Sequence, residues 1–424
     1  MSNLWDRVDA EDDDDAAYED ETNSYLNDPE KGWGLLAQLL PGKKGNRKVR
    51  YAARRLDWML DEQLIDTLHE LKLEDPAGYV RQVERLSDRL MDYGKLRLLR
   101  GKALVGLGGQ FSAGKSSFIN SVIGQESKIQ LPEDQIATTA IPTYVVSGEQ
   151  DEIHAFGNGA EVSLDVDAMK ALTHEFYDKY KIALGRFVDY IAIQNASFPK
   201  EWADKIAFLD TPGYNKSEAA TKQELTDKDI AERQLRNADA LIWLVHIKNG
   251  TIVTSDLEFL RSIDPAIPKL IVFTHADEQP QAALPAIVEG GKAALDDAGI
   301  PCFAVTAYDS RTGCEQLGKD NVRQFLSQVS ADRTSDARQE LRTLMKDLEQ
   351  RFQEAKKEIM EDWRVFGHAI GHSRNVRAIG SLTKLYRSCT LRLERLSEDR
   401  SSFYYMKRNM ETAIRALYGE EAMP

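Results

Sequence analysis

The pattern of apolar and polar positions divides the chain into three successive regions. Between residues 56 and 71, apolar side chains recur every three or four positions, which predicts an amphipathic helix. The segment "EDPAG" interrupts this periodicity, and a second helical stretch runs from there to about residue 100. We therefore expect residues 42–100 to form an N-terminal helical segment.

From residue 101 to about residue 330, short apolar runs alternate with helical patterns, and this alternation predicts an α/β domain. Apolar strands separated by helices are typical of a mostly parallel sheet that is covered on both faces. Residues 144–164 contain glycine-bearing turns and predict a local antiparallel hairpin. The apolar runs are "ALVGLG", "IPTYVV", "KIAFLD", "ALIWLVHI", "KLIVFT" and "PCFAVT".

Beyond residue 331 the pattern is helical again, with a sustained apolar stripe over residues 341–366. Gly367 and Gly371 are expected to interrupt this helix before it resumes with many arginine and lysine residues on its other faces. The aromatic and basic residues at 403–408 are open to two interpretations, an interfacial membrane anchor or packing within a core or partner contact. Residues 331–424 are thus expected to form a C-terminal helical segment.

Composition changes this picture mainly at the N-terminus. The 424 residues carry a net charge of -14, but twelve acidic residues against two basic ones fall within residues 1–31, so the remainder is close to neutral. A segment such as "DAEDDDDAAYEDE" repels itself and has little apolar surface to bury. We expect residues 1–41 to be an acidic disordered tail, with a docking segment as the alternative.

Apolar content and charge also argue against several classes of protein. No apolar run approaches the ~20 residues that cross a bilayer, and the acidic N-terminus lacks the apolar core of a signal peptide. The three cysteines are widely spaced, which fits a reducing compartment. The negative charge argues against nucleic-acid binding. We expect a cytoplasmic protein. The basic residues at 43–55 are open to two interpretations: a solvated start of a helix, or contact with an acidic partner or with lipid headgroups at the inner membrane face.

The segment "GLGGQFSAGKSSFINSVIG" carries the strongest chemical signal. It follows an apolar strand, opens into a helical pattern, and has four residues between Gly109 and the run Gly114, Lys115, Ser116, which is the full P-loop spacing. Glycines let consecutive backbone N–H groups converge on phosphate oxygens, and the helix N-terminus adds its positive end. Lys115 is expected to span the β- and γ-phosphates of a nucleotide, and the Ser116 hydroxyl to bind Mg²⁺.

Two further motifs follow at the ends of apolar strands. Asp210 and Gly213 in "IAFLDTPGYN" would bring a carboxylate near Mg²⁺ and a backbone N–H near the γ-phosphate. In "LIVFTHAD", Thr274 and Asp277 close a strand. A carboxylate there accepts both N1–H and the 2-amino group of guanine, which adenine cannot match.

Two other signals complete the set. Thr306 and Ala307 in "FAVTAYDS" are expected after the next strand, where a backbone amide would meet guanine O6. The loop "IATTAIPT" suits a switch whose threonine closes on Mg²⁺ and the γ-phosphate, with Thr139 preferred and Thr138 as the alternate. The P-loop and the three motifs at the ends of later strands, in this order, indicate a GTPase, in which water attacks the γ-phosphate in line.

The predicted site therefore has three overlapping groups of residues. Those expected to act in catalysis are Lys115, Ser112 and Thr139, and those expected to bind Mg²⁺ are Ser116, Thr139 and Asp210. Those expected to bind GTP are Gly109, Gln110, Phe111, Ser112, Ala113, Gly114, Lys115, Ser116, Ser117, Asp210, Gly213, Thr274, His275, Asp277, Thr306 and Ala307.

With these motifs in place, "GGQFSAGKSSFINSVIG" and "TTAIPT" resemble the bacterial dynamin-like GTPases and, less closely, the eukaryotic dynamins. The resemblance is specific over about residues 102–310 and rests on layout elsewhere. It implies an α/β fold, a P-loop GTPase domain with a mostly parallel sheet, flanked by N- and C-terminal helices that pack together as a helical bundle. It also implies slow GTP turnover that accelerates when two GTPase domains face each other, and Ser112 matches a serine that dynamins use near the bond between the β- and γ-phosphates.

The chain departs from the dynamin pattern at two positions. His275 stands where the guanine motif has a lysine whose stem covers the base, so an imidazole would stack there and we expect weaker nucleotide affinity. Phe111 stands where eukaryotic dynamins have the glutamine that orients the attacking water, and Gln110 lies one residue earlier. The group that orients the water is left open by the sequence.

The leading expectation is a dynamin-like GTPase that works at a membrane. It would act as a homodimer through its GTPase domains, with a second dynamin-like subunit as a further partner. The alternative is a GTP-controlled switch that binds a protein partner through its helices without remodelling lipid. A third class is an ATPase or a scaffold without nucleotide chemistry.

Overall fold

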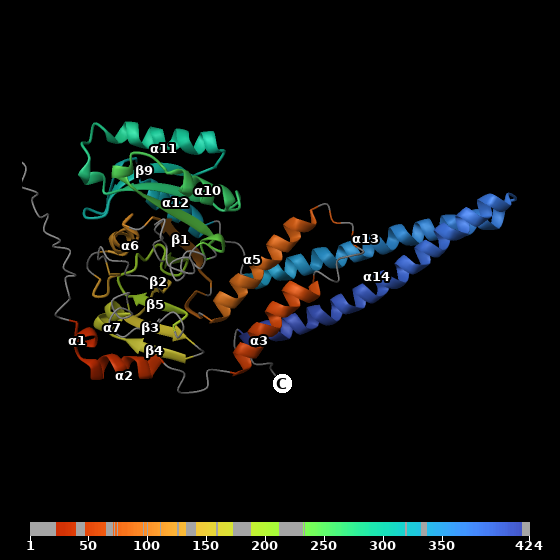
Figure 1. Cartoon of the computed structure of the whole chain (residues 1–424), viewed down its shortest axis with the longest axis horizontal. Helices are drawn as coiled ribbons and strands as arrows, with labels where there is room; N and C mark the ends of the chain where they lie inside the picture. The colour runs from red at the N-terminus through yellow and green to blue at the C-terminus, as the bar shows by residue number, and fades with distance from the viewer. Residues whose placement is uncertain are drawn as a thin grey trace, which may run out of the picture.

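An α/β domain and an elongated helical bundle that projects from it make up the described part of the molecule (Figure 1). The computed structural model describes residues 23–39, 47–64, 71, 73, 75–95, 97–99, 101–110, 112–124, 127–132, 141–157, 160–172, 188–211, 232, 234–318, 320–331 and 337–417.

The α/β domain is built on one ten-stranded sheet in the order β10-β9-β8-β7-β1-β6-β2-β5-β3-β4. The strands from β9 to β6 run parallel to their neighbours, and β2 pairs with β5 in parallel, so the expected mostly parallel sheet is confirmed. The strands are β1 (Ala103–Gly109), β2 (Thr143–Ser147), β3 (Glu152–Gly157), β4 (Ala160–Leu164), β5 (Tyr190–Asn195), β6 (Ile206–Asp210), β7 (Ala240–His246), β8 (Lys269–Thr274), β9 (Ala304–Asp309) and β10 (Cys314–Leu317).

The hairpin expected over residues 144–164 forms only in its second half. Strands β3 and β4 pair antiparallel, but β2 pairs with β5 and β6 instead of β3. Strand β5, which the sequence pattern did not indicate, lies between β2 and β3. Its run "YIAIQN" is short and buried on both faces, so it shows neither a long apolar run nor an alternation.

Side chains of the central strands alternate between two faces of the sheet. One face packs under α6 (Lys115–Ile123) and α12 (Asn321–Ala331), and its core includes Val105, Phe118 and Phe325. The strands at the β7–β9 end send Trp243 and Phe273 to the other face, under α10 (Thr254–Ser262) and α11 (Leu284–Ala298). The remaining part of that second face is covered by the helical bundle.

Four long helices form the bundle, as expected from the resemblance. They are α3 (Arg47–Trp58), which continues into the π-helical turn η1 (Met59–Gln63), α5 (Pro76–Lys95), α13 (Ala337–His372) and α14 (Val376–Leu417). The bundle core includes Leu56, Leu86 and Phe352, and it is continuous with Val146 of β2 and Leu209 of β6. The bundle therefore rests directly on strands of the α/β domain.

The start of the chain differs from the expected disordered tail over residues 1–41. Residues 23–39 contain α1 (Ser24–Asn27) and α2 (Pro29–Leu39), whose buried leucines join the core of the α/β domain near α7 (Val166–Ala171). The Asn23 side chain caps α1 at Tyr25 N and donates to the Asp167 carbonyl, each at 3.0 Å. The acidic residues lie mostly before residue 22, outside the described part, whereas the following stretch is rich in leucine and folds onto the sheet.

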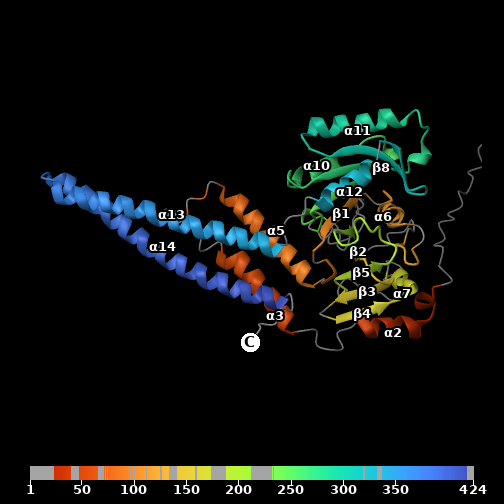
Figure 2. The ribbon, with the colours of Figure 1, turned by 180° about the vertical axis from the view of Figure 1, so that it is seen from behind.

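The C-terminal helices also correct one expectation. Gly367 and Gly371 do not interrupt the first helix, because α13 runs unbroken to His372. A side-chain carbon built at Gly367 would lie 3.3 Å from Tyr386 of α14, so the glycine permits the two helices to approach closely. The result is a long antiparallel hairpin whose tip lies far from the α/β domain (Figures 1 and 2).

The aromatic segment at 403–408 packs inside the bundle. Phe403 and Met406 are buried, the Phe403 ring lies 5.2 Å from that of Phe352, and only Tyr405 is strongly exposed among the aromatic residues of this segment. The interpretation as core packing is thus the one that the structure supports. Among the described helices, none combines the length and the apolar character needed to span a bilayer.

Candidate nucleotide-binding site

The P-loop lies where the sequence predicted it, between the end of β1 and the start of α6. Gly109 has φ 141°, and a side-chain carbon there would come within 2.3 Å of the Leu244 carbonyl oxygen, so only glycine fits. Gly114, with φ 74°, begins α6 in the left-handed region that glycine adopts without strain. Ser112 also has a positive φ, of 61°, and its side chain is exposed. These bends hold the loop in a tight turn before the N-terminus of α6.

Lys115 points back into this loop. Its Nζ donates to the carbonyl oxygens of Gly109 and Gln110, each at 3.3 Å, and the residue is buried. Burial lowers the pKa of Lys115, and the nearby Asp210 carboxylate opposes that shift. A buried lysine that contacts carbonyl oxygens in this loop is suited to bind an anionic ligand. Phosphate oxygens would stabilise its positive charge, which burial removes from water.

Asp210 ends β6 directly beside the start of α6. Its Oδ2 accepts a hydrogen bond of 2.8 Å from the Ser116 hydroxyl, whereas its Oδ1 is buried and has no hydrogen-bond partner within the described residues. Burial raises the pKa of Asp210, while Lys115 and Ser116 act in the opposite direction. An orphaned carboxylate oxygen beside a serine hydroxyl is a donor set that Mg²⁺ accepts, so these residues fit the predicted metal.

The remaining ligands of such an ion would come from the nucleotide and water. Among the residues that the structure describes, no cluster of three or more histidine, cysteine or acidic side chains could hold a metal. Mg²⁺ commonly binds through one or two protein oxygens together with phosphate oxygens.

The guanine motif at the end of β8 is tied to the P-loop. Thr274 is buried, and its hydroxyl donates to the Ala113 carbonyl at 2.9 Å. His275 has φ 56°, and its ring lies against Gly114, since a side-chain carbon there would be 3.1 Å from His275 Cε1. His275 stacks on His246 of β7, with ring centroids 4.2 Å apart and an interplanar angle of 8°.

Asp277 and its neighbour Glu278 lie on the short helix η5 (Ala276–Glu278). Asp277 forms an ion pair with Arg311, which lies on the turn after β9. Glu278 pairs with Lys248 at 2.9 Å, and this contact lowers the pKa of Glu278. The Asp277 carboxylate, which is expected to recognise the base, is therefore exposed to solvent on one side and paired with the long, exposed side chain of Arg311 on the other.

Thr306 and Ala307 are not in the loop where the sequence analysis expected them. Both lie inside β9, fully buried, with Thr306 opposite Val272 and Ala307 opposite Phe273 in the parallel ladder with β8. The Thr306 hydroxyl is bound to Glu315 and to the Leu317 carbonyl. The strand continues to Asp309, so the residues that follow it, including Arg311, occupy the position expected for the fourth motif.

Some predicted residues lie outside the described part of the structure. These are Phe111, both candidate switch threonines (Thr138 and Thr139), and Gly213. Gln110 and Ser117 are partly buried beside the loop, Gln110 at the end of β1 and Ser117 in α6. The structure thus brings together Lys115, Ser116, Asp210, Thr274 and His275 at the carboxyl edge of the sheet.

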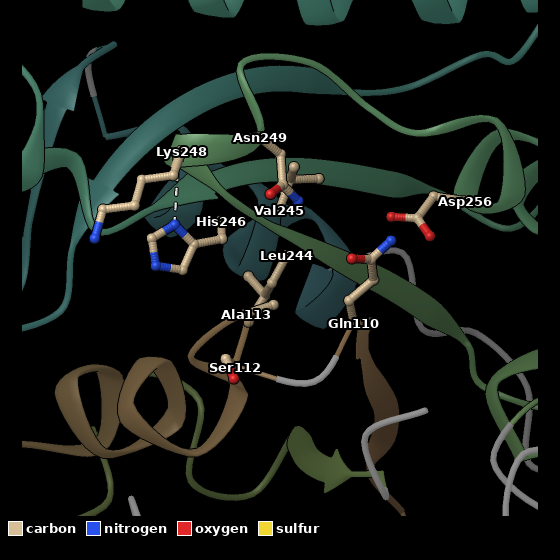
Figure 3. A pocket seen from close by; sticks show the side chains of 9 residues that line it. All are labelled: Gln110, Ser112, Ala113, Leu244, Val245, His246, Lys248, Asn249 and Asp256. Carbon is tan, nitrogen blue, oxygen red and sulfur yellow. Dashed lines mark hydrogen bonds between the residues drawn. The ribbon is translucent and has the colours of Figure 1, made fainter. Parts of the chain in front are cut away.

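A cavity of about 230 Å³ opens beside the P-loop. Gln110, Ser112 and Ala113 line it from the loop, while His246 and Lys248 line it from the end of β7 and the short helix η4 (Ile247–Asn249). Figure 3 shows the Gln110 and Asp256 side chains directed toward each other at one end of the cavity. The carboxylate of Asp256 is buried and accepts a hydrogen bond from Trp243 Nε1 at 3.2 Å.

Three residues near this site were missed by the sequence analysis: His246, Lys248 and Arg311. His246 does end a predicted strand beside the guanine motif, which is a detectable signal. Lys248 and Arg311 carry no motif, and only the fold brings them to Glu278 and Asp277.

Comparison with known proteins points to one family. A model of the dynamin family matches residues 105–275. Dynamin-like protein 2 of Campylobacter jejuni is 27% identical over 143 residues, which are 34% of this chain and 20% of that protein. This chain thus spans about a fifth of the length of that curated relative.

Solved structures include similar chains at low identity. A chain from an oligomerised bacterial dynamin pair is 15% identical, with a TM-score of 0.40 over 83% of this chain and 52% of its own. Era of Aquifex aeolicus, bound to GDP and aluminium fluoride, is 15% identical, with a TM-score of 0.32 over 54% of this chain and 57% of its own. The P-loop lies within the matched range, and together these findings lead to one conclusion: residues 105–275 of this chain are similar to the dynamin family of GTPases.

Proposed function

We propose that this protein hydrolyses GTP to GDP and phosphate and couples its nucleotide state to self-association and to contact with a membrane surface. The observation that carries the proposal is the convergence of Lys115, Ser116 and Asp210 at the mouth of the P-loop. Lys115 would neutralise phosphate charge, and Ser116 with Asp210 would hold Mg²⁺. When bound, Mg²⁺ would neutralise the charge that develops as the γ-phosphate leaves.

The guanine specificity is proposed to come from Asp277 and from the segment around it. Asp277 would accept two hydrogen bonds from guanine and give up its ion pair with Arg311 in doing so. Thr274 supports the arrangement because its hydroxyl fastens the motif to the P-loop carbonyl at Ala113. Base and phosphate recognition would then be parts of one rigid unit.

Coupling to the helices is supported by a shared core. Leu209 of β6 packs in the bundle core, and the next residue is Asp210 of the proposed metal site. A shift of β6 on nucleotide binding would therefore act on the bundle through direct packing, because close-packed cores transmit strain rather than absorb it. The bundle would relay the nucleotide state to the distant hairpin tip.

The hairpin tip, residues 363–393, is proposed to make the membrane contact. It holds no acidic residue and six arginine or lysine residues, in a chain whose net charge is -14. Four large apolar side chains are exposed on it: Val365, Val376, Leu385 and Leu391. Cationic and apolar groups exposed together suit a surface of anionic lipid headgroups.

Self-association through the GTPase domains is the remaining part of the proposal. The exposed Ser112 and the partly buried Gln110 lie at the P-loop surface, where a second copy could reach the phosphates. Turnover per protomer would then rise with protein concentration. A second dynamin-like subunit in place of the second copy would satisfy the same geometry.

The test is phosphate release measured across a series of protein concentrations, with and without vesicles. The parent protein should turn over GTP slowly at low concentration and faster at high concentration. Lys115→Ala should abolish turnover, and Lys128→Ala, which alters an exposed lysine of the same domain, should leave it unchanged. Equal turnover in the parent and in Lys115→Ala would contradict the enzymatic proposal, and a fast rate independent of concentration would contradict self-association.

A further inference from the structure

We propose that His246 and His275 act as one unit, a stacked pair of neutral imidazoles that forms the wall for the guanine base in place of the usual lysine, with His246 as the positioning residue. This inference rests on the proposed guanine-binding function and extends it to a residue outside the four motifs. The rings are nearly parallel, 4.2 Å apart at their centroids, and both belong to strand ends beside the P-loop.

Hydrogen bonds define the neutral form of His275. The Thr274 hydroxyl uses its single hydrogen on a backbone carbonyl, with Ala113 at 2.9 Å and Val245 at 3.3 Å as its acceptors. Thr274 Oγ1 also lies 3.2 Å from His275 Nδ1 and can only accept there. His275 therefore carries its proton on Nδ1.

The same reasoning defines His246. Its Nδ1 lies 3.2 Å from the Lys248 backbone nitrogen and accepts that N–H, as the dashed line in Figure 3 shows. The proton of neutral His246 is therefore on Nε2, which faces the Glu278 carboxylate at 3.7 Å. Each ring is thus held in one tautomer by a separate hydrogen-bond partner.

The surroundings favour the neutral form of the pair. Burial lowers the pKa of both histidines, and each also has cationic neighbours that lower it further. Among the charged groups that face the pair, Lys248 and Arg311 lower the histidine pKa values. Glu278 and Asp309 raise them. Lys248 forms an ion pair with Glu278. It therefore does not simply take the place of the lysine that the guanine motif usually has at position 275.

Stacking explains how the short imidazole of His275 could cover the base in place of a long lysine stem. The left-handed backbone at His275 directs the ring over Gly114, and contact with His246 fixes it there. Without a stacking partner, the ring could rotate away from the P-loop. A flat, fixed wall suits a purine, since aromatic rings attract one another when they stack with an offset.

The test is a double-mutant cycle on GDP affinity, measured by calorimetry with full-length protein and Mg²⁺. His246→Asn keeps an acceptor for the Lys248 N–H but cannot stack, whereas His246→Phe stacks but cannot accept. Each is made in the parent and in His275→Lys, which restores the usual lysine. The melting temperature without nucleotide reports whether each variant is folded.

If the pair is the base wall, His246→Asn raises the Kd for GDP about three- to tenfold in the parent, in line with aromatic pair energies, and His246→Phe stays within about twofold. In His275→Lys, His246→Asn has no more than a twofold effect, because the lysine stem needs no partner. An equal effect of His246→Asn in both backgrounds, or none in either, would overturn the inference. A folded parent that binds no GDP would contradict the proposed function instead.

Discussion

At the scale of single residues, the proposed site is defined by a buried acid, Asp210, whose second oxygen has no hydrogen-bond partner among the described residues. Asp210 and Lys115 are both buried, and burial shifts the pKa of each toward its neutral form. Such a pair is costly until an anionic ligand and a cation complete it. The nucleotide and Mg²⁺ would therefore stabilise the fold as well as serve the chemistry.

The variant Asp210→Asn tests this balance. It keeps the shape and the hydrogen bond from Ser116 but removes the buried charge, so the nucleotide-free protein should melt at an unchanged or higher temperature. Stabilisation by GDP with Mg²⁺, which reaches about 2.7 kcal/mol at a ligand concentration of 100 times Kd, should be lost. A lower melting temperature without ligand, together with intact stabilisation by Mg²⁺ and GDP, would rule out the assigned role.

The histidine pair gives a prediction about pH. Because the pKa of both rings is lowered in the folded protein, their contribution to stability is complete above pH ~6.5 and declines as the pH falls, when the unfolded chain takes up protons that the native pair resists. The urea midpoint should therefore drop between pH 7.5 and 5.5 more in the parent than in His246→Phe. Identical drops in the two proteins would show that His246 is not held neutral.

Sequence motifs predicted the positions of some site residues correctly and misplaced others. Lys115, Ser116 and Asp210 meet as the motifs required, because a P-loop works only at the junction of a strand and a helix. Thr306 and Ala307 were misplaced, because pairing with β8 and β10 extends β9 beyond the point that its apolar run suggests. The stacking of His246 on His275 depends on two strands that are adjacent only in the folded sheet.

At the scale of elements, the antiparallel pairing of α13 and α14 depends on a few buried aromatic side chains. Phe403→Ala should lower the free energy of unfolding by about 3–5 kcal/mol, because the ring is buried against Phe352 and leaves a cavity. Tyr405→Ala is the matched control on the same helix. Its ring is exposed, so the change should stay within about 0.5 kcal/mol in urea denaturation. Equal losses in the two variants would refute the assignment of the buried face.

Element type could be read from the sequence, whereas element ends and partners could not. Helical periodicity identified the bundle helices, but glycines at 367 and 371 suggested a break that packing against Tyr386 removes. The acidic composition of the first residues led us to extend the expected tail to residue 41, whereas residues 23–39 fold, because the leucines of α2 pack against a sheet that lies far away in the sequence. Tertiary contacts decided both cases.

At the scale of the whole molecule, charge is distributed unevenly along the chain. The first 31 residues are strongly acidic, whereas the hairpin tip at residues 363–393 is free of acidic residues. Figures 1 and 2 show this tip at the end of the projecting hairpin, well separated from the α/β domain. A contact at the tip would thus hold the α/β domain at a distance from the surface that the tip binds.

Sedimentation with anionic vesicles tests the tip. Reversing the exposed Arg374 and Arg377 to glutamate should lower partitioning more than tenfold, since a basic residue near an anionic surface contributes about 1 kcal/mol. Reversing Lys356 and Lys357, exposed on α13 outside the tip, makes the same change in net charge and should have a small effect. Similar losses in both variants would show that binding follows net charge and not the tip.

The central claim is that the P-loop and Asp277 together select a guanine nucleotide. Calorimetric titration of the folded parent protein with GDP and with ADP, each with Mg²⁺, tests it most directly. GDP should bind at one site per chain, and ADP should bind at least about 100-fold more weakly, because it leaves the Asp277 carboxylate unpaired. Absence of heat with GDP, or equal binding of both nucleotides, would contradict the account.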